Sequence, residues 1–207
     1  MIRLFIDTSL ANVSISVIKD KEELATISKS IPNMHSVYAV SFVKQVLDIA
    51  KIDANLIDEI YVVNGPGSFT GLRIGVTIAK TYGYLIKKDI IPVSTLKMLA
   101  ISSNTDGVIM SIIPANKSHY YVGVYDNNYD ILYDEKFVSK EEVLELANKY
   151  EPYMVSVNQD VIGNRKINKV ELNIEKIIDY YQDKERVNYY KLVPNYLKLP
   201  QAVEDKK

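Results

Sequence analysis

The sequence predicts an α/β protein built from two similar lobes. Three short strand-like runs open the chain and lead into alternating helical and apolar segments, and the same order of segments returns in the second half. A chain of 207 residues is long enough for two small domains. The order strand-strand-strand-helix-strand-helix, met twice, indicates a duplicated fold.

The first half begins with the strand-like runs IRLFID, VSISVIK and ELATISKSI, separated by the turn-prone segments TSLAN and DKE. A helix is predicted over residues 36–51, where apolar residues recur at helical spacing. The apolar strand EIYVV, a glycine-rich turn and a second helix over residues 70–87 follow. The strand IIPVS and the helical segment TLKMLAISS complete this half.

The second half contains the strands VIMSII, HYYVGVYD and ILYDEKFV. A helix follows at SKEEVLELANKY, where Ser139 and Glu142 form a capping-box pair. The strand YMVSVN and a helix over residues 171–181 come next. Two β-β-β-α-β-α lobes predict the duplicated ribonuclease-H-like, actin-like (ASKHA) architecture of actin, sugar kinases and Hsp70. We expect an N-terminal lobe over residues 1–104 and a smaller C-terminal lobe over residues 105–207.

Composition limits the partners and the chemistry. The net charge of −1 comes from interspersed charges of both signs, so we expect RNA contact to be shared with a partner. The absence of cysteine excludes disulfides and thiolate catalysis. The start MIRLFIDTS lacks a long apolar core and no apolar run has membrane-spanning length, which predicts a cytoplasmic protein with no membrane contact.

The stretch VVNGPGSFTGLRIGVTIAKTYGYL raises the question of a phosphate-binding loop. A Walker-type loop needs four residues between its glycines, but Gly65 and Gly71 are separated by five. A dinucleotide fingerprint starting at Gly65 would need its third glycine at Thr70. Two interpretations remain: a helix amino terminus that attracts an anion, and a tight strand-to-helix turn capped by Ser68 or Thr70.

Small residues recur at every fourth position of the helix after this turn, at Gly71, Gly75, Ala79 and Gly83. Each mid-helix glycine costs about 1 kcal/mol relative to alanine, so another backbone is expected to approach this ridge closely. The sequence leaves open whether that backbone belongs to the same chain or to a partner. Under the partner interpretation, replacing Gly75 by leucine should abolish complex formation and leave the monomer folded.

Candidate catalytic groups are few. The segment FIDTS places Asp7 and Ser9 where actin-like proteins face phosphate, although Asp-Thr-Ser at a strand end is also an ordinary hairpin turn. The two histidines, His35 and His119, lie far apart without a helical histidine partner, so no metal site is predicted. Ser68 has no assignable base, and no catalytic constellation is predicted.

The segment GPGSFTGLRIG resembles the signature of the TsaB (YeaZ) family of bacterial tRNA threonylcarbamoyladenosine synthesis. LFIDTS resembles the opening strand of that family, His35 and Ser36 its first-helix start, and PVSTL its following strand. VPNYLKLPQA resembles its carboxyl-terminal pattern. The resemblance spans nearly the whole chain and is densest in the first hundred residues.

This resemblance implies a non-catalytic subunit that binds and activates a paralogue of the TsaD type. That paralogue holds the metal and transfers the threonylcarbamoyl group to the adenosine beside the anticodon of tRNAs that read codons beginning with A. ATP and metal are then expected only in partner subunits, a TsaE-type ATPase is a further partner, and tRNA is reached only through the complex. Without its partner the chain is expected to form a homodimer.

The resemblance also implies that the first two helices of the N-terminal lobe form the interface with the partner. The residues expected at this seam are Val40, Val43, Leu47, Gly71, Gly75, Ala79 and Gly83. Where the paralogue has His-x-x-x-His, this chain has His35 and then Ala39. It also reads Pro114-Ala115-Asn116 where many family members have Asp-Ala-Arg, which leaves contact between the second lobe and the ATPase open.

The alternative hypothesis is an ATP-binding or ATP-hydrolysing enzyme of the ASKHA class. It would act through Asp7, Ser9 and the glycine turn. ATP binding or hydrolysis by the isolated chain, abolished on replacing Asp7 by alanine, would support it.

Overall fold

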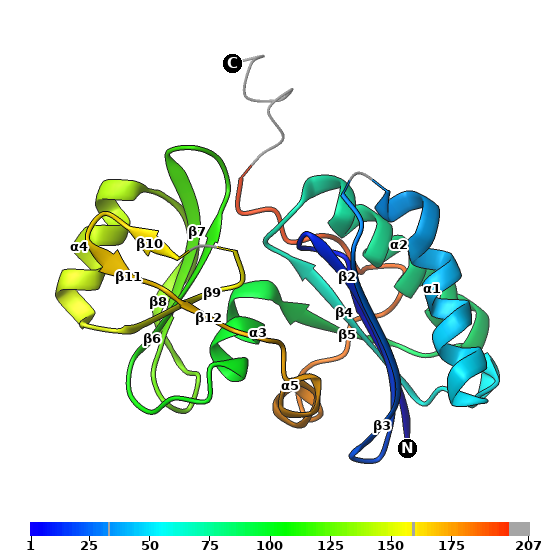
Figure 1. The fold of residues 1–207 in the computed structure, drawn as a ribbon. Coiled ribbons are helices and arrows are strands. Elements are labelled where there is room, and N and C mark those ends of the chain that lie inside the picture. Colours follow the sequence, from blue (N-terminus) through cyan, green and yellow to red (C-terminus); the bar gives the residue numbers. More distant parts are fainter. Residues whose placement is uncertain (33, 159, 199–207) are drawn as a thin grey trace. The chain divides into compact units, whose positions relative to one another are not determined.

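The computed structural model of the chain describes residues 1–32, 34–158 and 160–198. Within them the chain forms two compact units, each built on one five-stranded sheet (Figure 1). The first unit holds Met1–Ser94 and Ile178–Asn195. The second holds Thr95–Ile177 and the described residues from Tyr196. The final residues of the VPNYLKLPQA pattern lie outside the described part.

The first sheet has the strand order β3-β2-β1-β4-β5. Its strands are β1 (Ile2–Asp7), β2 (Asn12–Lys19), β3 (Glu22–Ser30), β4 (Glu59–Gly65) and β5 (Ile90–Ser94). β1, β2 and β3 form an antiparallel meander, whereas β1, β4 and β5 run parallel. The helical segments of this unit are α1 (His35–Ala50), η1 (Ala54–Leu56) and α2 (Phe69–Ile86).

Helices α1 and α2 cover one face of the first sheet and contact each other (Figure 1). The core between them and the sheet consists of aliphatic side chains, including Leu4 and Ile6 from β1 and Val43 from α1. Alternate residues of β1 and β2 point to this core, and Phe5 and Ser16 between them are buried as well, so both faces of these strands are covered. Both helices end on a lysine in the left-handed conformation, Lys51 and Lys87.

The second sheet has the strand order β12-β9-β6-β7-β8. Its strands are β6 (Ile109–Pro114), β7 (His119–Tyr125), β8 (Ile131–Ser139), β9 (Tyr153–Ser156) and β12 (Asn168–Lys169). A two-stranded hairpin consists of β10 (Val161–Ile162) and β11 (Arg165–Lys166). The remaining helices are α3 (Thr95–Ser102), α4 (Lys140–Tyr150) and α5 (Ile174–Tyr181).

The two sheets share one topology. In each, the first strand in chain order lies at the centre, pairs antiparallel with the second and parallel with the fourth, and the fifth extends the parallel side. This repetition confirms the predicted duplicated, actin-like α/β fold. The lobes differ in two connections: the hairpin β10–β11 of the second stands where the first has helix α2, and η1 of the first has no counterpart between α4 and β9. The predicted strand-to-helix step from YMVSVN to residues 171–181 therefore omitted a hairpin and the short strand β12.

The compact units differ from the predicted lobes of residues 1–104 and 105–207. Helix α3 belongs to the second unit, and the segment Ile178–Asn195 returns to the first. This segment is held by a ladder bridge in which Val187 and Ile90 exchange two backbone hydrogen bonds of 2.8 and 2.9 Å. Its Leu192 side chain is buried in the first core. The predicted boundary missed this return, because the sequence pattern of a late segment does not show that it pairs with an earlier sheet.

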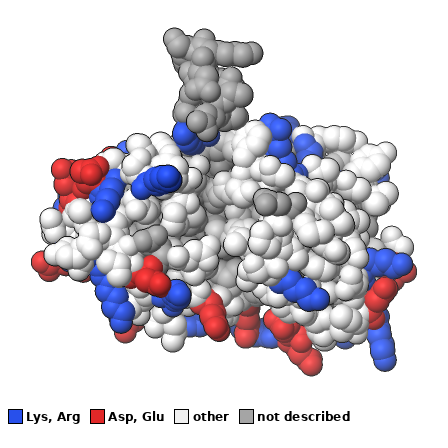
Figure 2. Space-filling model, turned by 45° about the horizontal axis from the view of Figure 1, so that its top comes forward, with Lys and Arg blue, Asp and Glu red and all other residues white. Residues whose placement is uncertain are grey.

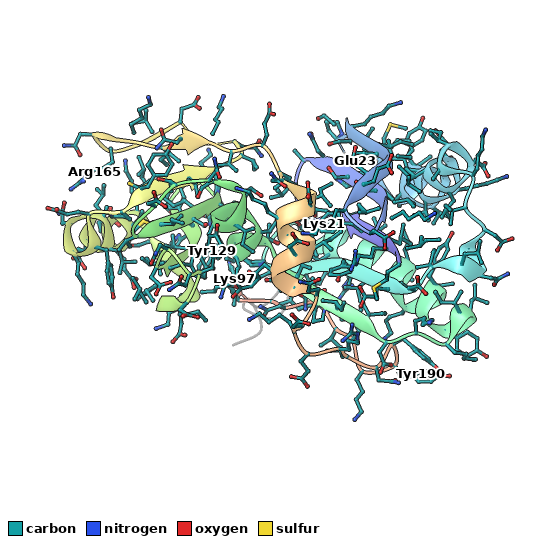
Figure 3. The ribbon with its side chains drawn as sticks, turned by 90° about the horizontal axis from the view of Figure 1, so that it is seen from below. Lys21, Glu23, Lys97, Tyr129, Arg165 and Tyr190 are labelled. Atoms are coloured by element: carbon teal, nitrogen blue, oxygen red, sulfur yellow. The ribbon has the colours of Figure 1, made fainter. Side chains whose placement is uncertain are left out.

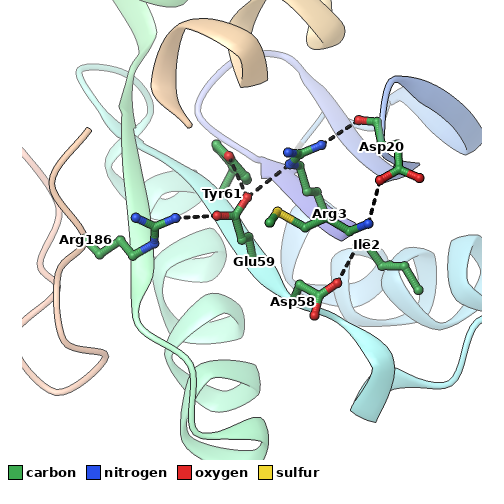
Figure 4. A network of polar contacts seen from close by, with 8 residues as sticks. Ile2, Arg3, Asp20, Asp58, Glu59, Tyr61 and Arg186 are labelled. Atoms are coloured by element: carbon green, nitrogen blue, oxygen red, sulfur yellow. Dashed lines mark hydrogen bonds and ion pairs between the residues drawn. The ribbon is translucent and has the colours of Figure 1, made fainter. Parts of the chain in front are cut away.

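A buried carboxylate also anchors the returning segment (Figure 4). Glu59, at the start of β4, accepts hydrogen bonds from Arg3 Nε and from the Tyr61 hydroxyl, both at 3.0 Å. Its other oxygen forms an ion pair with Arg186. Burial tends to raise the pKa of Glu59, but the hydrogen bonds from Arg186, Arg3 and Tyr61 outweigh it and the net pKa is lowered. The charge is therefore paired on both oxygens.

Candidate partner-binding face and the glycine turn

The glycine turn packs against the first hairpin of its own chain. Thr8, just after β1, donates a hydrogen bond from Oγ1 to the carbonyl oxygen of Gly71 at 2.6 Å. A Cβ atom at Gly71 would overlap the Thr8 carbonyl oxygen, and one at Gly75 would overlap Thr8 Oγ1. Ser68 N donates to the carbonyl oxygen of Ser9 at 2.8 Å. These positions are glycine because the hairpin occupies the space of a side chain.

The start of helix α2 matches the interpretation of a tight strand-to-helix turn capped by Ser68. Ser68 is its N-cap, and Ser68 Oγ accepts a hydrogen bond from Gly71 N at 3.2 Å. The turn before it contains a cis peptide bond between Gly65 and Pro66. The described contacts of this turn are those of a tight strand-to-helix connection.

The small-residue ridge of α2 is buried within its own unit, together with most of the predicted seam. Gly71, Gly75, Ala79 and Gly83 are buried, and a Cβ atom at Gly83 would lie 3.0 Å from Tyr189 Cβ. Val43 and Leu47 are buried in the first core. These six predicted seam residues are therefore buried within the described monomer, and their place at a partner interface stays a prediction. The backbone that approaches the ridge belongs to the same chain.

Val40 is the one predicted seam residue that is exposed, at 59%. Val37 precedes it by three positions on α1 and is 62% exposed. Residues at this spacing share one helix face, so the two valines form an exposed aliphatic pair beside the buried Val43. The sequence prediction omits Val37, although its spacing from Val40 signals a second apolar stripe.

Asp7 ends β1 and is almost fully buried. Its Oδ1 atom accepts hydrogen bonds from Ser9 N at 2.8 Å and from Ser9 Oγ at 2.7 Å. Burial raises the pKa of Asp7 to about 6, although the bonds from Ser9 and the charge of His35 act in the opposite direction. The structure therefore brings the predicted pair Asp7 and Ser9 together, through hydrogen bonds within the turn that follows β1.

His35 and His119 occupy different environments. His35 Nε2 lies 3.1 Å from the Leu10 carbonyl oxygen, so the start of α1 is tied to the first hairpin. The His119 ring stacks on Phe137 with ring centroids 4.8 Å apart. Among the residues that the structure describes, no group of three or more His, Cys, Asp and Glu side chains is placed to hold a metal ion.

The segment Pro114-Ala115-Asn116 forms the turn between β6 and β7. Asn116 Oδ1 accepts hydrogen bonds from the backbone N–H groups of Ser118 at 3.0 Å and His119 at 2.9 Å. The asparagine therefore caps this turn, a role that its side chain performs well. Asn116 stands where many family members have arginine, and here its side chain stabilises the turn.

The surface carries charged side chains of both signs, as the composition predicts. Basic and acidic side chains are interspersed on the face drawn in Figure 2, in line with a net charge of −1. No helix in the described part of the chain is long and apolar enough to cross a membrane.

The fold and this site define a two-lobed protein of the actin-like class. The family model described as TsaD, tRNA N6-adenosine threonylcarbamoyltransferase, matches residues 27–183. The chain is 28% identical to the TsaB tRNA threonylcarbamoyladenosine biosynthesis protein of Bacillus subtilis, over 96% of this chain and 95% of that protein. It is 31% identical to the TsaB protein of Buchnera aphidicola subsp. Schizaphis graminum, over 73% of this chain and 71% of that protein.

The solved structure of YeaZ from Pseudomonas aeruginosa has the same fold, with a TM-score of 0.75 at 20% identity over 95% of this chain and 99% of that one. The chain therefore belongs to the TsaB (YeaZ) branch of the family that the TsaD model describes.

Proposed function

We propose that this chain is a non-catalytic subunit in tRNA threonylcarbamoyladenosine biosynthesis that binds and activates a TsaD-type subunit. The observation that carries the proposal is the similarity to the Bacillus subtilis TsaB protein over nearly the full length of both chains. The partner subunit would supply the metal and transfer the threonylcarbamoyl group to the adenosine beside the anticodon, in tRNAs reading codons that begin with A. The proposed place of action is the cytoplasm.

The exposed pair Val37 and Val40 on α1 supports a partner surface. Each side chain is more than half exposed, so covering the pair would remove apolar surface from water. The face lies on a helix whose opposite side is fixed in the core, so it is held in place before binding. A TsaD-type subunit is the proposed occupant, and a second copy of the chain would cover the same face when that subunit is absent. A TsaE-type ATPase is proposed as a further partner, and ATP and metal are assigned to the partner subunits.

Size-exclusion chromatography with light scattering tests this surface. The chain and a TsaD-type subunit should form a complex, and Val40→Asp should prevent it because the aspartate would be desolvated at the seam. The matched control is Ile131→Asp on β8, which changes an aliphatic residue of similar exposure in the second unit. Complex formation by Val40→Asp as readily as by Ile131→Asp would refute the assignment of the seam to α1.

A second candidate function, ATP binding through Asp7 and Ser9, is favoured by one observation. A buried carboxyl group with a raised pKa is a common feature of functional sites. Calorimetric titration of the isolated chain with ATP and Mg²⁺ tests it. Binding in the micromolar range that is abolished in Asp7→Ala would support this function, and a silent titration would eliminate it.

A further inference from the structure

Three tyrosines gather on the surface where the returning segment crosses the end of α2. The Tyr189 and Tyr190 rings lie 4.5 Å apart, and Tyr84 of α2 packs edge-on against both, with ring centroids 6.1 and 6.2 Å away. Tyr84 is 48% exposed and Tyr190 is 67% exposed. Figure 3 shows Tyr190 at the outer edge of the first unit. We call these three residues the tyrosine patch.

Lysines accompany the tyrosine patch in space or in sequence. Lys87 Nζ lies 3.9 Å from the centroid of the Tyr84 ring. Lys88 follows Lys87 in the sequence, and the exposed Lys191 follows Tyr190. The acid nearest in sequence, Asp89, accepts a hydrogen bond from Asn188 Nδ2 at 3.1 Å. Residues 84–91 and 187–193 together contain three lysines and one acid, so their summed charge is positive although the whole chain is nearly neutral.

The tyrosine patch is held rigidly. Lys80 Nζ donates hydrogen bonds to the carbonyl oxygens of Tyr190 at 3.2 Å and Leu192 at 3.1 Å. Asn188 Oδ1 accepts from Tyr190 N at 3.1 Å, which fixes the turn that presents the tyrosine. Exposed rings on an anchored turn lose little conformational entropy when a ligand stacks on them.

We propose that the tyrosine patch binds a single-stranded stretch of RNA, with unpaired bases stacking on Tyr190 and Tyr84 and phosphates contacting Lys87, Lys88 and Lys191. Unstacked bases of RNA loops bind aromatic side chains in this way, and lysines supply the backbone contacts. Protein interfaces are enriched in tyrosine but depleted in lysine, so the mixture favours RNA over a protein partner. Naming the RNA as the anticodon loop of the substrate tRNA rests on the proposed function.

Fluorescence anisotropy with a labelled anticodon stem-loop RNA tests the proposal, with the full chain alone and with its TsaD-type complex. Tyr190→Ala should weaken binding on the order of tenfold, since one base loses its stacking surface. Lys191→Glu should reduce the slope of log affinity against log salt by about 0.7 for each phosphate that the lysine no longer neutralises. The matched controls are Tyr153→Ala and Lys166→Glu, at exposed positions of the second unit.

RNA affinity that falls in the two patch variants and holds in the two controls supports the proposal. Equal RNA affinity in all four variants, or no RNA binding by the wild-type chain in either form, overturns it. Patch variants that bind RNA normally but fail to join the TsaD-type subunit also overturn it, because the surface would then be a protein contact. Failure of the proposed function is a separate result: the wild-type chain would neither form the complex nor affect modification.

Discussion

Thr8 and Gly71, 63 positions apart, touch each other directly: Thr8 Oγ1 donates to the Gly71 carbonyl oxygen at 2.6 Å, and the Thr8 carbonyl occupies the place of a side chain at Gly71. This interaction joins the first hairpin to the start of α2. It assigns the glycine turn to internal packing.

Gly71→Ala should destabilise the first unit by about 1–3 kcal/mol, because the new methyl group would force the Thr8 backbone to move. The gain in helix propensity, about 1 kcal/mol, offsets only part of this cost. Thr77→Ala, at an exposed position of α2, is the control and should stay within about 0.5 kcal/mol of wild type. Urea unfolding followed by circular dichroism gives both values. Wild-type stability in Gly71→Ala would contradict the packing.

Gly75→Leu should lower the yield of folded chain, because its side chain would meet Thr8 and Val62 in the core. The partner interpretation of the sequence predicts instead a folded monomer that fails to bind its partner. Near-ultraviolet circular dichroism of the purified variant distinguishes the two. A native spectrum combined with failure to bind would support the partner interpretation.

Asp7→Asn should stabilise the protein at pH 7.5. The folded-state pKa of about 6 lies above the usual value of 3.8, so the ionised carboxylate costs stability, on the order of 3 kcal/mol at 1.36 kcal/mol per pKa unit. This cost is complete above pH 6 and disappears below pH 3.8, where both states are protonated. The unfolding free energies of Asp7→Asn and wild type should therefore converge as the pH falls. A constant difference between about pH 4 and pH 7.5 would refute the raised pKa.

Glu59→Gln should destabilise the protein at pH 7 and loosen the returning segment at Arg186. Because the folded-state pKa of Glu59 is lowered, its contribution is present above pH 4.5 and disappears as the pH falls through the folded-state pKa. The difference in unfolding free energy between variant and wild type should shrink in acid. Faster amide hydrogen exchange at Val187 at pH 7 would mark the loosened segment, and unchanged exchange would argue against the anchor.

Ser139→Ala should cost about 1 kcal/mol by removing the N-cap of α4, where Ser139 Oγ accepts from Glu142 N at 3.2 Å. Ser41→Ala on the exposed face of α1 is a control that removes no N-cap. Chemical unfolding monitored by circular dichroism compares the two. Equal stabilities would show that the cap contributes nothing.

The long periodic elements can be predicted from the sequence because their apolar spacing repeats over several turns or pleats. Helix α2, for example, is predicted over residues 70–87 and spans Phe69–Ile86. The hairpin β10–β11 and strand β12 could not be predicted, since two-residue strands show no periodicity. Their positions are set by backbone pairing, of β10 with β11 and of β12 with β9.

The candidate site is only partly predictable for a related reason. Four-residue spacing of small side chains in α2 shows that a backbone comes close, but not which one, and here Thr8 and Tyr189 fill the space. For α1, one apolar spacing joins the exposed Val37 and Val40 to the buried Val43. Which of these valines are buried depends on the folded chain, so the spacing alone could not separate the core side of α1 from its exposed side.

The most direct test of the proposed function is the yield of threonylcarbamoyladenosine on tRNA in a reconstituted mixture. The mixture contains the enzyme that forms threonylcarbamoyl-adenylate, the TsaD-type subunit and the TsaE-type ATPase, with or without this chain. An activating subunit predicts modification only when the chain is present, abolished by Val40→Asp but not by Ile131→Asp. Equal modification in the presence and absence of the chain would contradict its role as an activating subunit.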